Sequence, residues 1–261
     1  MITISPGHYG PCTGASGIID EGTENIRVAK KVTAILRASG ITTNYIEDNI
    51  NKSAKQNIPW LIAQHNKTSR EIDVSIHFNS SVGTHSKGIG TETLVYSDKN
   101  KEVAQKITDA IANASGLKNR GAKIRTDLGL LKGTNKPCYL IEVCFVNDTV
   151  DVALYRRDFD KICREIANEL AKAVGKSLKP STTASVTVED KGARKLDINS
   201  PSLNDLAKSI LESKAQREIL VNYAIAEGMH KSWLDKLNNR TITNDEILVL
   251  AAAAIVNVSK V

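Results

Sequence analysis

Short apolar runs and longer amphipathic stretches alternate along the first two thirds of the chain. The apolar runs predict strands at residues 2–4, 41–46, 71–78, 88–96, 119–123 and 138–145. The amphipathic stretches predict helices at residues 20–38, 59–66, 99–115 and 149–174, with Pro59 in the first turn of the second helix. Strands that alternate with helices are typical of an α/β fold. We therefore expect a mostly parallel twisted sheet flanked by helices.

The pattern changes after residue 177. Residues 178–199 contain a segment rich in proline, serine and threonine and then a charged run, which is typical of a linker. Residues 200–261 return to helical patterns, with a capping box at 243–246. We therefore expect an α/β domain over 1–177, a linker over 178–199 and a small all-helical domain over 200–261. A domain of that size is near the lower limit for folding alone, which favours a binding or self-associating module.

The composition narrows the classes of partner. Hydrophobic residues make up 41% of the chain and charged residues 25%, which is ordinary for a globular protein with a core. The net charge of +6 favours acidic partners, among them nucleic acid, anionic lipid and the anionic polymers of a bacterial wall. Aromatic residues are only 4% of the chain, which leaves little material for stacking bases. We therefore expect no nucleic-acid partner.

The cysteines and the first residues of the chain indicate the cellular compartment in which the protein is made. The four cysteines show no Cys-x-x-Cys spacing, and we expect them to be small core residues of a protein in a reducing compartment. Met1 leads straight into a predicted strand, without the basic and apolar segments of a signal peptide. We therefore expect a protein that is made in the cytoplasm and has no exit route of its own.

Two histidines follow predicted strands directly. His8 comes after the first strand and a Pro6-Gly7 turn, and His77 ends the strand at 71–78. Ligands of open α/β sheets bind at the carboxyl ends of the strands. Two imidazoles at that edge suit a hydrolytic zinc ion. His65 and His85, by contrast, are expected on the surface of a helix and a loop.

A catalytic zinc commonly has three protein ligands, so one more is needed. Glu21 and Glu24, in the first turn of the helix at 20–38, are the candidates. Acidic residues are also favoured at helix N-termini by the helix dipole alone. The residue pattern therefore does not choose between these two glutamates, or between a ligand and a helix cap.

Glu142 lies inside the apolar run at 138–145. A carboxylate in a buried strand is costly unless it is paired or functional. Burial raises the pKa of such a group and suits it to transfer protons near neutral pH. The alternative is a buried salt bridge to Arg120 or Lys123. We favour the functional interpretation, because the two histidines are expected at the same edge.

Five sequence blocks, in order over about residues 1–175, carry a family resemblance: Ser5-Pro6-Gly7-His8, Glu21-Gly22-Thr23-Glu24-Asn25, Ser75-Ile76-His77-Phe78-Asn79, Asn119-Arg120-Gly121-Ala122-Lys123 and Ile141-Glu142-Val143-Cys144-Phe145-Val146. Each block alone is weak, but five in this order are specific. The chain resembles the zinc-dependent N-acetylmuramoyl-L-alanine amidases of bacterial autolysins and phage endolysins.

The resemblance implies roles for four residues. The family's zinc ligands fall on His8, Glu21 and His77, and its catalytic glutamate falls on Glu142. Glu21 is selected over Glu24 because the family's glutamate precedes the helix asparagine by four residues, and that asparagine here is Asn25. The loop at 9–12 lacks the second glycine pair and the aspartate of many relatives, which concerns substrate contacts and not the metal.

The implied reaction is hydrolysis of the amide between N-acetylmuramic acid and L-alanine in bacterial peptidoglycan. With no signal peptide, we expect a phage or prophage endolysin that is made in the host cytoplasm and acts on the cell wall after release. The C-terminal helices would bind anionic wall polymers or form a homo-oligomer. Two alternatives remain: a metallopeptidase acting on the stem peptides, and a non-catalytic wall-binding protein that kept the fold.

Overall fold

A computed structural model covers the chain of 261 residues. It describes residues 1–10, 12–50, 53–180, 218, 221–222, 232–239, 242–243 and 247. The chain separates into two compact units, residues 1–180 and residues 181–261, and each is considered by itself. No helix in the described part of the chain has both the length and the apolar character that crossing a bilayer requires.

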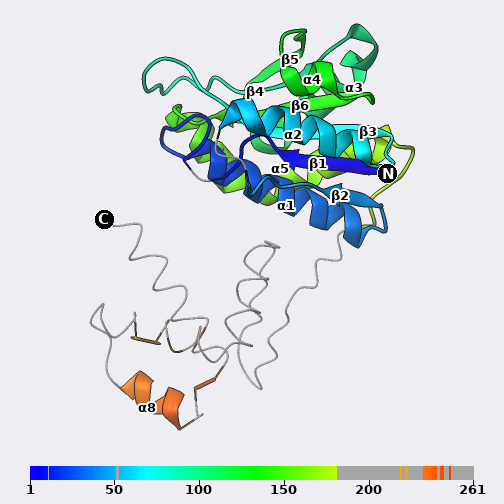
Figure 1. Cartoon of the computed structure of the whole chain (residues 1–261). Coiled ribbons are helices and arrows are strands. Elements are labelled where there is room, and N and C mark those ends of the chain that lie inside the picture. Colours follow the sequence, from blue (N-terminus) through cyan, green and yellow to red (C-terminus); the bar gives the residue numbers. More distant parts are fainter. Residues whose placement is uncertain are drawn as a thin grey trace. The chain divides into compact units, whose positions relative to one another are not determined.

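A six-stranded sheet forms the centre of the first unit (Figure 1). Its strands are β1 (Ile2–Pro6), β2 (Thr43–Tyr45), β3 (Ile72–Asn79), β4 (Thr91–Val95), β5 (Asn119–Ile124) and β6 (Cys138–Phe145). They lie in the order β2-β1-β3-β6-β4-β5. The first four of these pair in parallel, whereas β4 runs antiparallel to β6 and parallel to β5. The expected α/β class is confirmed, with a sheet that is mixed at one edge.

Helices cover both faces of this sheet (Figure 1). They are α1 (Glu21–Ala38), α2 (Ala54–Lys67), α3 (Lys101–Ser115), α4 (Gly129–Gly133) and α5 (Thr149–Ala173), and a 3₁₀ turn, η1 (Asp98–Asn100), precedes α3. Helices α1 and α3 both pack against α5, and α2 packs against α4. The helices therefore form two groups, one on each face.

The alternation of side chains along β6 separates two apolar cores. Tyr139, Ile141 and Val143 belong to the larger core, which α1, α3 and α5 cover. Cys138 and Leu140 belong to a smaller core with residues of α2 and α4. Successive side chains of a strand point to opposite faces, so Glu142 shares the face of Leu140. The proposed catalytic acid therefore lies on the α2 and α4 side of the sheet.

The structure corrects two details of the sequence analysis. Helix α2 begins at Ala54, so Pro59 lies inside it and not in its first turn. The polar residues Lys55, Gln56 and Asn57 concealed this start, because they show no apolar period. Residues 129–133, for which no helix was predicted, form the short helix α4.

The cysteine prediction is met in three positions of four. Cys138, Cys144 and Cys163 are buried free thiols, whereas Cys12 is exposed. Burial raises the pKa of the Cys163 thiol, and raises that of Cys144 well above its ordinary value. These buried thiols are packing residues, as inert as buried structural cysteines usually are.

Few of the predictions for the C-terminal part fall on described residues. Helix α8 (Ser232–Asn238) lies within residues 200–261, where helices were predicted. The linker beyond residue 180 and most of the capping box at 243–246 lie outside the described residues. Residues up to 180 belong to the first unit. The domain boundary at residue 177 and the helical domain at 200–261 therefore stay predictions.

Candidate metal centre

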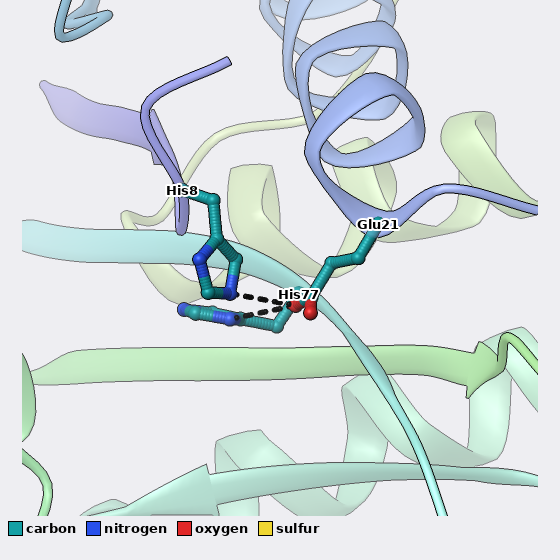
Figure 2. Close-up of side chains that lie close together, drawn as sticks. All are labelled: His8, Glu21 and His77. Carbon is teal, nitrogen blue, oxygen red and sulfur yellow. Dashed lines mark hydrogen bonds and ion pairs between the residues drawn. The ribbon is translucent and has the colours of Figure 1, made fainter. Parts of the chain in front are cut away.

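Three side chains that are far apart in the sequence meet at the carboxyl ends of β1 and β3 (Figure 2). His8 follows β1, His77 lies near the end of β3, and Glu21 is the first residue of α1. One ligand atom from each lies within 4.8 Å of the others. In the described part of the chain this is the one such group of potential metal ligands.

Both imidazoles face the same carboxylate oxygen. His8 Nε2 and His77 Nδ1 each lie 3.1 Å from Glu21 Oε1, as the dashed lines in Figure 2 show. The two rings are 5.1 Å apart at their centres and nearly perpendicular, at 77°. The ring nitrogens and the carboxylate therefore converge on one small space from three directions.

Backbone groups fix the Glu21 carboxylate in place. The Ala15 N–H donates to Oε2 at 2.7 Å, and the Phe78 N–H donates to Oε1 at 3.0 Å. The Asp20 carboxylate caps α1 by accepting from the Thr23 N–H at 2.8 Å, which sets where the helix begins. A ligand that is held by backbone donors needs little reorganisation to bind a cation.

The charge states of these side chains favour the binding of a cation. Burial alone would raise the pKa of Glu21, but hydrogen bonds from His77 and His8 outweigh it and hold the pKa well below its usual range. Burial also lowers the pKa of the His77 imidazole, although Glu21 opposes this. A charged Glu21 carboxylate beside a His77 imidazole that favours the neutral form is the state in which these groups bind metals.

Two glycines leave room for the imidazoles and the carboxylate. A Cβ atom on Gly7 would overlap the His77 ring. A Cβ on Gly14 would lie 2.5 Å from Glu21 Oε2 and 2.7 Å from the His8 ring, and Gly14 also has a φ of +82°. The loop between β1 and α1 can therefore pass this close only because these positions have no side chain.

These residues fit a zinc ion. Two imidazole nitrogens and one carboxylate oxygen are the ligands of several catalytic zinc sites, which keep the fourth position open. Hard cations such as Mg²⁺ and Ca²⁺ prefer all-oxygen sites. The donor set of His8, Glu21 and His77 thus favours zinc or a similar transition metal.

Glu142 lies next to this group across the sheet. In the parallel pairing of β3 with β6, Glu142 is the register partner of His77. The residue is partly exposed, but its Oε2 is buried and has no hydrogen-bond partner among the described residues. Burial, with the negative charges of Glu21 and Glu92, raises the pKa of Glu142 to about 8. Such a carboxyl can both give and take a proton near neutral pH.

The salt bridge to Arg120 or Lys123, considered above as the alternative role of Glu142, is formed by Glu92 instead. Arg120 Nε donates to Glu92 Oε2 at 2.7 Å, and Lys123 Nζ pairs with the same oxygen. Glu92 lies directly opposite Glu142 in the antiparallel pairing of β4 with β6. Glu92 was not predicted as a site residue, although it carries the same signal as Glu142, a carboxylate within a buried strand.

Glu24, the other candidate ligand, points elsewhere. It accepts a hydrogen bond from the Tyr155 hydroxyl and forms an ion pair with Arg27 at 3.3 Å. Of the two glutamates that the residue pattern left open, the structure brings Glu21 to the histidines and places Glu24 in contact with α5.

The expectation that His65 lies on the surface was wrong. Its side chain is fully buried, with Nδ1 2.7 Å from Asp73 Oδ1 and Nε2 3.0 Å from Ser5 Oγ. Arg70 adds a two-pronged contact to Asp73 at 2.7 and 2.8 Å. This network links α2 to β1 and β3 a few residues before His8 and His77 in the sequence. His85 is partly buried in a loop.

Comparison with known proteins identifies the family. Residues 2–176 match the N-acetylmuramoyl-L-alanine amidase family, so the chain belongs to it. An uncharacterised Clostridium perfringens protein is 32% identical over 186 residues, which is 69% of this chain and 54% of that protein. The endolysin of Bacillus phage SPP1 is 26% identical over 169 residues, 60% of this chain and 59% of the endolysin. The chain spans about half the length of the curated relatives it matches.

Solved structures show the same fold. The catalytic domain of the CD27L endolysin, which targets Clostridia difficile, superposes with a TM-score of 0.60 and 26% identity, over 68% of this chain and 98% of that domain. The catalytic domain of CwlV, an N-acetylmuramoyl-L-alanine amidase from Bacillus (Paenibacillus) polymyxa, gives a TM-score of 0.55 and 26% identity, over 67% and 98%. The matched part of this chain thus spans nearly the whole fold of each of these two domains.

Proposed function

We propose that this chain is a zinc-dependent amidase that hydrolyses the bond between the lactyl group of N-acetylmuramic acid and L-alanine in peptidoglycan. The observation that carries the proposal is the convergence of His8, Glu21 and His77 beside Glu142. These four residues occupy the sheet edge at which α/β enzymes bind their ligands. Family membership of residues 2–176 supplies the substrate class.

The role of each of the four residues follows from the chemistry of its side chain. His8, Glu21 and His77 would hold the metal. A zinc ion bound there supplies a Lewis acid for water activation and carbonyl polarisation. Glu142, whose Oε2 is free of other partners among the described residues, takes the proton of the attacking water. It then passes that proton to the leaving amine, so the carbon–nitrogen bond breaks and a carboxylate and an amine form.

Endolysins among the relatives support a role in wall lysis. The SPP1 endolysin and the CD27L catalytic domain are both similar to residues of the first unit. We therefore favour a phage or prophage lysin, which reaches the wall after release, over an enzyme of wall maintenance.

Product analysis tests the reaction. Purified peptidoglycan is digested with zinc-loaded protein, and the soluble products are identified by mass spectrometry. The amidase releases intact stem peptides with a free L-alanine amino group, and the glycan keeps its muramic acid carboxyl groups. A metallopeptidase would release fragments of the stem peptide instead. A protein that only binds the wall would release nothing at full zinc occupancy.

For residues 181–261 we propose a module that holds the enzyme at the wall, because a short linker gives a tethered enzyme a high local substrate concentration. The test compares sedimentation of the full chain and of residues 1–180 with purified walls. Preferential binding of the full chain supports the module. Equal binding, with a larger apparent mass of the full chain on a sizing column, would favour self-association.

A further inference from the structure

A small cavity opens beside the candidate metal centre, on the α2 and α4 side of the sheet. Its volume is about 110 Å³, and His8 and His77 form part of its lining. Most of the rest is apolar and comes from Leu61 of α2, Leu130 of α4 and Leu140 of β6. Because two of the candidate metal ligands line it, whatever enters this cavity lies next to the reacting bond. We call it the side cavity.

The mouth of the side cavity lies between the start of α2 and the start of α4. Ala54 and Ile58 of α2 are exposed there, and Ile58 is 37% exposed despite its apolar side chain. Gly129 faces Ile58 so closely that an added Cβ would lie 2.6 Å from the Ile58 Cγ2. Gly129 and Ile58 are therefore in close contact, and the lining at this end of the cavity is apolar.

Two polar side chains of the lining have unused hydrogen-bonding capacity. Asn57 and Ser75 are 1% and 0% exposed, and Asn57 Oδ1 and Ser75 Oγ have no partner among the residues that the structure describes. The Asn57 amide nitrogen donates to the Gly7 carbonyl at 3.3 Å, which leaves Oδ1 as the free acceptor. Buried polar atoms are rarely left unpaired, because each costs about 1–3 kcal/mol. Both residues line the side cavity, so a group bound there would lie near these two side chains.

We propose that the side cavity is a specificity subsite for the acetamido group of muramic acid, a proposal that rests on the amidase function above. This group combines a methyl, an N–H donor and a carbonyl acceptor. The methyl suits the leucine lining, the N–H suits Asn57 Oδ1, and the carbonyl oxygen suits the Ser75 hydroxyl. These features lie on the same muramic acid residue that carries the scissile amide.

The volume agrees with this occupant. On the same measure a cavity needs only about 10–15 Å³ to hold one water molecule, so 110 Å³ has room for a group of several non-hydrogen atoms. The acetamido group has four non-hydrogen atoms. A single methyl group, such as that of L-alanine or of the lactyl group, would leave both polar atoms unpaired.

Three soluble muropeptides that differ only at the muramic acid nitrogen test the subsite. They carry N-acetyl, N-butanoyl or a free amine, and kcat/KM is measured for each with zinc-loaded full-length protein. We expect kcat/KM to fall at least about tenfold for both altered substrates, because a missing or extra methylene in such a pocket changes rates about 10- to 200-fold. The neutral butanoyl substrate separates the effect of size from that of the amine charge.

The variant Ile58→Trp closes the mouth without changing the buried lining, and Lys55→Trp places the same ring at an exposed position of α2 outside the cavity. We expect Ile58→Trp to lower kcat/KM for the N-acetyl substrate at least about tenfold and to leave the free-amine substrate within about twofold of its wild-type value. Lys55→Trp should leave both values unchanged. Zinc content and circular dichroism verify that each variant is folded and loaded.

Binding to metal-free protein gives a second readout. In saturation-transfer NMR with N-acetylmuramic acid, the acetyl methyl should receive more saturation than the lactyl methyl, and Ile58→Trp should abolish the difference. Equal saturation of the two methyls would overturn the proposal, as would equal kcat/KM for the three substrates. In those cases the amidase function stands, whereas failure to cleave any of the three muropeptides would remove the function and the subsite together.

Discussion

His77 of β3 and Glu142 of β6 lie side by side as register partners in the parallel part of the sheet. This pairing places a candidate metal ligand and the proposed proton carrier on neighbouring strands and on the same face. A slip of one residue between the strands would turn one of the two side chains to the opposite face. The separation of His77 and Glu142 is therefore set by backbone hydrogen bonds between the strands and not by flexible loops.

The three candidate ligands should bind zinc as a unit. We expect His8→Ala, Glu21→Ala and His77→Ala each to weaken zinc binding by at least about 100-fold, because each variant lacks one of the three donors. Loss of a residue that only supports a ligand typically weakens metal binding by about 10- to 100-fold, and loss of a ligand itself should cost more. Metal analysis after dialysis against a weak chelator measures this. Zinc should also raise the Tm of the wild type but not of these variants. The variant His85→Ala, outside the group, should behave as wild type; loss of zinc there as well would point to a different site.

Replacement of Glu142 should separate binding from turnover. Glu142→Gln keeps the size of the side chain but cannot carry the proton, so zinc should bind normally while kcat falls by about 10²- to 10⁴-fold. Metal content and muropeptide hydrolysis are measured on the same preparation. Hydrolysis at the wild-type rate would exclude Glu142 from the proposed role.

Gly7 should control metal affinity without contributing a ligand. In Gly7→Ala the new methyl group overlaps the His77 ring, which must move, so we expect zinc affinity to fall about 10- to 100-fold. Gly133→Ala is the matched control, because its methyl group would press on Ile62 and not on a candidate ligand. Equal zinc affinities of the two variants would show that the close approach of Gly7 to His77 has no role.

The buried network under the site should matter for stability. Asp73→Ala leaves the buried Arg70 and His65 without their carboxylate, and the free energy of unfolding should fall by about 3–5 kcal/mol. Asp98→Ala, at an exposed position of η1, should change it by no more than about 0.5 kcal/mol. Denaturant unfolding measures both, and similar small losses in the two variants would mean that the network contributes little.

The ionisation of Glu142 predicts a pH dependence of stability in metal-free protein. Its pKa is raised from 4.5 to about 8, so the folded state binds this proton more tightly than the unfolded state. The contribution is complete below the unfolded pKa and is lost as the pH rises through about 8. Glu142→Gln has no such titration, so its stability relative to wild type should rise between about pH 5 and about pH 8. A difference that does not change with pH would contradict the raised pKa.

Much of the architecture follows from local patterns. The strand at 138–145 was predicted at the residues where it occurs, because an apolar run interrupted only by Glu142 is typical of a parallel strand covered on both faces. The start of α1 follows from the Asp20 cap. The reversed direction of β4 was not predicted, because strand direction depends on how the chain crosses the sheet and not on the residues within the strand.

The candidate site was predictable where a residue type common in catalytic or metal sites stood within a strand or at its end. Glu142 and the two strand-end histidines carried that signal. His65 did not, because its partners Ser5 and Asp73 lie on other elements and only the folded chain brings them together. Asp73, however, is a carboxylate within a predicted strand, the same signal that singled out Glu142, and it could have revealed the network.

The most direct test of the central claim is an anomalous difference map at the zinc edge, from a crystal of the protein grown with zinc. The account predicts one strong peak at about 2.0–2.2 Å from a nitrogen of His8, a nitrogen of His77 and an oxygen of Glu21, with the Glu142 carboxyl beside it and not bound to it. A peak elsewhere, or a structure at full zinc occupancy in which these three side chains do not share one ion, would contradict it.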